Sequence, residues 1–68
     1  MNAPRTLVME MPNGRTRSVP MHVSPERVME RYRAALLPSE RIMLNADGWT
    51  IVQTNRDGTE TRTRYRVT

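Results

Sequence analysis

The pattern Asn-x-Asp-Gly occurs twice in this sequence, as NADG at 45–48 and as NRDG at 55–58. Asn first, Asp third and Gly fourth favour a type I turn closed by a left-handed glycine, which joins two antiparallel strands through a three-residue loop. The segment MPNGR at 11–15 carries Pro and Gly at matching positions. Three such signals in a short chain predict an antiparallel sheet built from hairpins.

The segments beside these turns alternate between apolar and polar residues, which is the period of a strand with one buried face. The predicted strands are 5–11, 15–23, 41–45, 49–54 and 59–68. Pro20 lies in the second of them and has no N–H to donate to a neighbouring strand. That strand is therefore expected to lie at an edge of the sheet or to be broken at the proline.

One segment between the second and third strands has a helical pattern, SPERVMERYRAAL at 24–36. Ser24 is a good N-cap, and Pro25 suits the first helical position. Pro38 is expected to end the helix at or just before Leu37. The apolar residues of the segment gather on one side of such a helix, as expected for packing on a core: Val28, Met29, Tyr32, Ala35 and Leu36.

These elements predict a single small α+β domain over residues 5–68, preceded by a flexible leader at 1–4. Its expected order is ββαβββ, with one helix packed on an antiparallel sheet of four to five strands.

The last hairpin predicts which side chains share a face. A three-residue loop pairs Trp49 with Tyr65 and Val52 with Arg62. One face then carries the apolar set, which the helix is expected to cover: Trp49, Ile51, Tyr65 and Val67. The opposite face carries a mainly polar set: Thr50, Val52, Thr54, Glu60, Arg62, Arg64 and Arg66.

The same loop length at NADG places Met43 on the helix-covered face and leaves Ile42 and Leu44 beside Val52 on the opposite face. Three aliphatic side chains next to arginines form a patch that a monomer would leave partly wet. We therefore expect Ile42, Leu44 and Val52 to form an apolar interface with a second copy of the chain or with a partner protein.

The small size of the chain also favours association with a second copy or with a partner protein. With 68 residues, one Trp, two Tyr and no Phe, it can build only a thin core. Proteins of this size usually gain stability from disulfides, a metal ion or a partner subunit. There is no Cys and His22 is the single His, so a disulfide is excluded and no metal or other cofactor is expected. The remaining sources of added stability are a homodimer or docking on a partner.

Arg62, Arg64 and Arg66 recur at every second position of the last strand, so they form a charged line about 13 Å long on one face. All eleven basic residues of the chain are Arg, and the formal net charge is +4. Arg carries a planar fork of donors that suits phosphates and carboxylates. With Arg17 and Arg15 of the first hairpin nearby, the row predicts a surface for the phosphates of a nucleic acid.

Two other interpretations explain the same row. Exposed strands carry charge to deter aggregation, so the row need not have a ligand. Arg is also enriched at protein interfaces, so the row fits an acidic protein surface as well. The expected function is therefore a small accessory binding protein that contacts nucleic acid or a nucleoprotein. The alternative is an inhibitor or adaptor, of the kind phages and mobile elements encode, that occludes a host protein.

No combination of residues predicts catalysis. His22 lies in an alternating strand at a solvent-facing position, and no nucleophile is paired with it. Asp47 and Asp57 are explained by their turns, and no phosphate loop or dinucleotide fingerprint is present.

No apolar run approaches the roughly 20 residues that span a bilayer. We expect a non-enzymatic protein that works in the cytoplasm of a bacterium or in the interior of a host cell, away from membranes.

Overall fold

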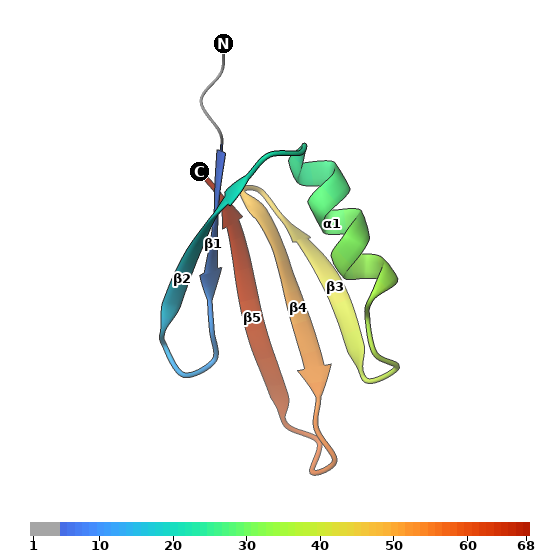
Figure 1. Cartoon of the computed structure of the whole chain (residues 1–68). Helices are drawn as coiled ribbons and strands as arrows, with labels where there is room; N and C mark the ends of the chain where they lie inside the picture. The colour runs from blue at the N-terminus through green and yellow to red at the C-terminus, as the bar shows by residue number, and fades with distance from the viewer. Residues whose placement is uncertain (1–4) are drawn as a thin grey trace.

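The computed structural model describes residues 5–68, so the predicted leader at 1–4 lies outside the described residues. The elements follow the predicted ββαβββ order of an α+β fold: β1 (Arg5–Glu10), β2 (Thr16–Met21), α1 (Pro25–Ala34), β3 (Glu40–Asn45), β4 (Gly48–Thr54) and β5 (Glu60–Val67). The five strands form one antiparallel sheet in the order β2-β1-β5-β4-β3 (Figure 1).

The first and last strands pair in the middle of this sheet. Leu7 lies opposite Val67, and Thr6 and Thr68 exchange backbone hydrogen bonds of 3.2 and 2.9 Å. This pairing joins the β1–β2 hairpin to the β3–β4–β5 meander. It also leaves β2 and β3 at the two edges, which confirms the edge position expected from Pro20.

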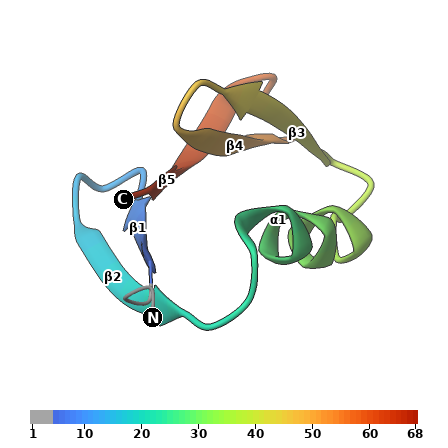
Figure 2. The same cartoon turned by 90° about the horizontal axis from the view of Figure 1, so that it is seen from above.

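The helix α1 connects the two edge strands across one side of the curved sheet (Figure 2). Ser24 caps its start, since the Ser24 hydroxyl oxygen accepts from the Arg27 amide at 3.4 Å. The predicted end near Leu37 is wrong, because the helix stops at Ala34 and the Ala35 amide already bonds to the carbonyls that close the last turn. The residues after it carry the chain to the start of β3, where the Leu37 carbonyl accepts from the Glu40 amide at 2.9 Å.

The core lies between α1 and the sheet. Its buried members are Leu7, Met21, Trp49 and Tyr65. Trp49 and Tyr65 are cross-strand partners, as predicted, and their rings stack with centroids 5.5 Å apart. Tyr32 of α1 closes the aromatic cluster at 5.9 Å from Trp49 and 4.7 Å from Tyr65. No helix residue is fully buried, so α1 covers this core without entering it deeply.

The turn at 45–48 differs from its prediction. Asn45 pairs with Gly48 across a two-residue turn, and Gly48 does not have a positive φ. The predicted three-residue loops are present at 11–15 and 55–58, where Gly14 (φ 85°) and Gly58 (φ 87°) are left-handed. The same tetrapeptide pattern therefore adopts two different turns in one chain.

The side-chain hydrogen bonds of the two turns also differ. The Asp57 carboxylate accepts from the amide of Thr59 at 3.0 Å and from its hydroxyl at 2.6 Å, which holds the longer loop. These hydrogen bonds also lower the pKa of Asp57, the one from the Thr59 hydroxyl most strongly. Trp49 stands at the matching place after Asp47 and has no hydroxyl to donate. The Asp47 carboxylate instead accepts from the Arg64 guanidinium.

Gly48 is required for close approach of β5. A Cβ at this position would overlap the carbonyl oxygen of Tyr65 and would lie 2.9 Å from the carbonyl carbon. The Val67 amide donates to the Asp47 carbonyl at 2.7 Å and holds β5 against the turn. Only a residue without a side chain permits this contact.

The shorter turn reverses the faces of β3 relative to the prediction. Ile42 lies opposite Ile51, and Leu44 lies opposite Trp49, so both are on the helix side of the sheet. Met43 faces the other way, on the side of Val52. The predicted interface of Ile42, Leu44 and Val52 on one face is therefore wrong, because a shift of one residue moves every side chain of a strand to the other face.

Gly48→Ala is expected to destabilise the protein by about 2–3 kcal/mol, because the new methyl group would overlap the backbone of β5. Gly14→Ala is the matched control. Nothing lies within 4 Å of its Cβ position, so only its positive φ is unfavourable, by about 1–2 kcal/mol. Urea unfolding followed by Trp49 fluorescence measures both losses. A smaller loss for Gly48→Ala than for Gly14→Ala would contradict the close approach.

Candidate functional site

The candidate site lies on the side of the sheet that faces away from α1, which we call the outer face. Arg62, Arg64 and Arg66 all lie on it, because they alternate along β5 with Tyr65 and the other residues of the helix side. The structure therefore places the predicted arginine row on one face. β1 and β4 flank the row, and β3 lies beyond β4.

Each arginine of the row is paired with a carboxylate. The partners come from β5 itself, from the β3–β4 turn and from β1, so the row links three parts of the chain. The pairs are Arg62 Nη2 with Glu60 Oε1 at 3.1 Å, Arg64 Nη2 with Asp47 Oδ2 at 3.1 Å, and Arg66 Nε with Glu10 Oε1 at 2.7 Å. The last contact is an ion pair without a hydrogen bond, because the Nε–H of Arg66 does not point at the oxygen.

Arg41 of β3 joins the row from the other side. Its Nη2 lies 2.7 Å from Glu60 Oε2, so Glu60 bridges Arg41 and Arg62 across the width of β4. Val52 stands between these two arginines in the strand register and is fully buried (0 % exposed) although it lies on the outer face. The apolar stems of long charged side chains cover surface in this way. Val52 therefore lies beneath the charged side chains of the ion cluster and has no exposed surface for a partner.

Glu60 is charged at neutral pH. The hydrogen bond from Arg41 is the largest cause that lowers its pKa below the ordinary value, and the bond from Arg62 is the next. A lowered pKa means that the stabilisation from this carboxylate is present above the pKa of the unfolded chain. It is lost as the pH falls through the folded value.

The outer-face cluster is nearly neutral. It contains four guanidinium groups and three carboxylates, so its net charge is +1: Arg41, Arg62, Arg64, Arg66, Glu10, Asp47 and Glu60. The alternation of residues along β5 predicted the row but not its partners. Strand periodicity places a side chain on a face, whereas the strand beside it depends on the sheet order.

Arg17 and Arg15 do not extend the row. Arg17 lies opposite Met9, and Met9 lies opposite Tyr65, so Arg17 is on the helix side of the sheet. Arg15 belongs to the first turn, where its amide donates to the Asn13 side chain at 3.0 Å. The prediction that Arg17 adds to the phosphate-binding surface is corrected, because β2 lies beyond β1 and presents Arg17 on the opposite face. The contribution of the Arg15 side chain stays a prediction.

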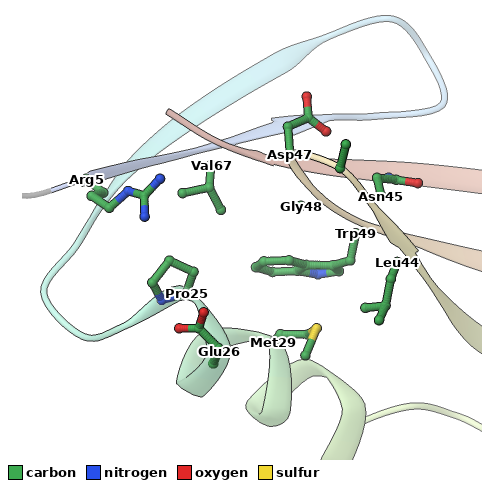
Figure 3. A pocket seen from close by; sticks show the side chains of 11 residues that line it. Arg5, Pro25, Glu26, Met29, Leu44, Asn45, Asp47, Gly48, Trp49 and Val67 are labelled. Carbon is green, nitrogen blue, oxygen red and sulfur yellow. The ribbon is translucent and has the colours of Figure 1, made fainter.

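A pocket of about 310 Å³ opens on the helix side, between the start of α1, the β3–β4 turn and the end of β5 (Figure 3). Figure 3 shows the Trp49 ring between Val67 and Met29, with Arg5 and Leu44 at opposite ends. The Trp49 Nε1 is buried and has no hydrogen-bond partner among the described residues. The walls come from elements far apart in the chain, so no local pattern predicts this pocket.

The remaining sequence-based questions concern metal ligands, His22 and membrane spans. No group of three or more His, Cys, Asp or Glu within residues 5–68 is arranged to hold a metal ion. His22 is exposed just after β2. The helix Pro25–Ala34, the single helix in this part of the chain, is not long and apolar enough to cross a membrane.

Arg41→Gln is expected to raise the pKa of Glu60 toward its ordinary value, because the substitution removes the strongest hydrogen bond to that carboxylate. A pH titration of the Glu60 side-chain carboxyl by NMR measures the shift. Arg33→Gln is the control, since Arg33 pairs with Glu30 of α1 and should leave the Glu60 pKa unchanged. An unchanged pKa in Arg41→Gln would show that the bridge is absent in solution.

The outer-face cluster and the pocket are therefore the two features from which a function can be argued. Comparisons with protein-family models, with curated proteins and with solved structures found no match to this chain.

Proposed function

We propose that the protein is a small non-enzymatic binding module whose outer face docks on another protein. The observation that carries the proposal is the pairing of the arginine row. The side chains of Arg62, Arg64 and Arg66 are 60, 47 and 38 % exposed, yet each already contacts a carboxylate. A protein surface carries charges of both signs, so it can be complementary to the arginines and to the carboxylates at once.

A nucleic acid matches this face less well. Duplex DNA carries one negative charge per roughly 1.7 Å of helix axis. A large share of its affinity for proteins comes from counterions that leave the DNA when basic residues neutralise its phosphates. On the outer face such a polyanion would meet Glu10, Asp47 and Glu60 among the arginines, with a net charge of only +1 to attract it.

Stacking offers no substitute for this missing charge. Single-stranded nucleic acids bind to exposed aromatic rings. Tyr32, Trp49 and Tyr65 pack on one another on the helix side of the sheet, so none of them is presented on the outer face.

The mode of action that fits is occlusion. Arg is enriched at protein interfaces because its fork of donors binds carboxylates with defined geometry. The ion pairs of the outer face hold the guanidinium groups in place before a partner arrives, which reduces the entropy lost on binding. A module of this kind acts as an inhibitor or adaptor by covering a surface of its partner.

Capture of a partner tests the proposal. Wild type is used as bait in a lysate of the source cells, beside a triple variant with Arg62, Arg64 and Arg66 changed to Gln. The control triple variant carries Arg27→Gln, Arg31→Gln and Arg33→Gln on α1, so the same charge is removed elsewhere. We expect wild type and the control to retain the same partner and the outer-face variant to lose it. Equal capture by all three proteins would contradict a docking role for the outer face.

A titration with nucleic acids tests the rival function, in which the arginine row binds phosphates. Fluorescence anisotropy of labelled duplex and single-stranded DNA and RNA, at about 50 and 200 mM salt, should show only weak binding with a shallow salt dependence. Tight binding that falls steeply with salt and is lost in the outer-face variant would overturn the choice of a protein partner. It would instead assign the arginine row to phosphates.

A further inference from the structure

The two edges of the sheet are built differently. The edge strand β2 carries Arg17 and Pro20, and both kinds of residue deter the addition of another strand. The edge strand β3 begins with the charged residues Glu40 and Arg41, but its segment Ile42–Leu44 has neither charge nor proline. Leu44 is 66 % exposed and Met43 is 45 % exposed. A short apolar segment of this kind at an open edge is a template for pairing with another strand.

The backbone of this edge is oriented for such pairing. The Thr54 amide donates to the Ser39 carbonyl at 2.9 Å, so Ser39 and Thr54 form a hydrogen-bonded pair in the β3–β4 register. Bonded and non-bonded pairs alternate along antiparallel strands. Met43 therefore bonds to β4, whereas Ile42 and Leu44 direct their amides and carbonyls outward.

We propose that β3 pairs with β3 of a second copy of this chain, antiparallel and with Met43 on the two-fold axis. In this register Ile42 of one copy lies opposite Leu44 of the other, and their outward amides and carbonyls bond to each other. On the outer face, Met43 of one copy lies opposite Met43 of the other. Arg41 of one copy lies opposite Asn45 of the other, whose side chain ends in an amide.

The register follows from the side chains. A shift of two residues in one direction sets Leu44 opposite Glu40, and a shift in the other direction sets Met43 opposite Asn45. Both shifts place apolar side chains against charged or polar ones. Only the register centred on Met43 gives Ile42, Met43 and Leu44 apolar partners, so the edge is complementary to itself.

The thin core favours a second copy as the occupant. The core cluster has four buried residues, Leu7, Met21, Trp49 and Tyr65, and none of them comes from α1. The sequence has no Cys, and residues 5–68 contain no group of three or more His, Cys, Asp or Glu arranged to hold a metal ion. A small domain without such links commonly gains its stability from a partner subunit, and two-fold dimers are the commonest assemblies. The pairing would extend the sheet through both copies and keep the two outer faces on one side, free for the proposed docking.

Cross-linking tests the register. The sequence has no Cys, so Met43→Cys supplies the single thiol. Residues opposite each other in a non-bonded antiparallel pair have Cα atoms about 4.5 Å apart, within the range of a disulfide. We expect rapid formation of a disulfide-linked dimer at micromolar concentration under mild oxidation.

Arg41→Cys is the matched control, because it lies on the same strand and the same face and is also exposed. In the proposed register the two copies of position 41 are offset by four residues, about 13 Å, and should not cross-link. Equally fast cross-linking of both variants would overturn the register.

The mass of the unmodified protein tests the dimer itself. Sedimentation equilibrium over a concentration series should show a dimer for wild type and a monomer for Leu44→Arg, which places a charge next to the two-fold axis and opposite Ile42 of the second copy. Leu37→Arg changes another exposed apolar residue, 58 % exposed and outside β3, and should remain a dimer. A wild-type monomer at millimolar concentration would overturn the inference. The outer-face proposal would be unaffected, because it rests on the row Arg62, Arg64 and Arg66 of β5, which takes no part in the β3 pairing.

Discussion

The contact between β5 and the β3–β4 turn is the constraint on which the outer-face cluster and the open edge of β3 both depend. The Tyr65 carbonyl lies against the bare Cα of Gly48, and the Val67 amide bonds to the Asp47 carbonyl at 2.7 Å. This contact accompanies the two-residue turn that sets the register of β3. With that register, Arg41 reaches the outer face to meet Glu60, and Leu44 turns to the helix side. A turn one residue longer would exchange the two faces of β3.

The ion pairs on the outer face organise the arginines more than they stabilise the fold. Exposed pairs of this kind contribute about 0–1 kcal/mol each, and salt weakens them. Their effect is on geometry and charge, because a row of three arginines becomes a mosaic of both signs over the buried side chain of Val52. The same residues that suggest a phosphate-binding row in isolation therefore form a surface of mixed charge, and the proposed docking on a protein is argued from that mixture.

Local chemistry predicted those parts of the fold that neighbours in the chain determine. Ser24 marked the start of the helix, and Pro20 marked an edge strand. The 55–58 turn gave the register that pairs Trp49 with Tyr65. The predicted three-residue loop at 45–48 was wrong. Gly48 does not have a positive φ there, and it is needed because the backbone of β5, which is distant in the chain, packs against it. The helix end near Leu37 failed as well, since the helix stops early and the following residues lead the chain to the edge strand β3.

The sequence by itself determined the order of the elements, the arginine row on one face of β5 and the absence of disulfides, because these follow from periodicity, turn chemistry and composition. Only the tertiary structure decided which carboxylates meet the arginines and which apolar residues remain at the open edge. Glu10 reaches Arg66 because β1 pairs with β5, and Leu44 is exposed because β3 ends the sheet. Both outcomes depend on contacts between segments distant in the chain, which local patterns do not encode.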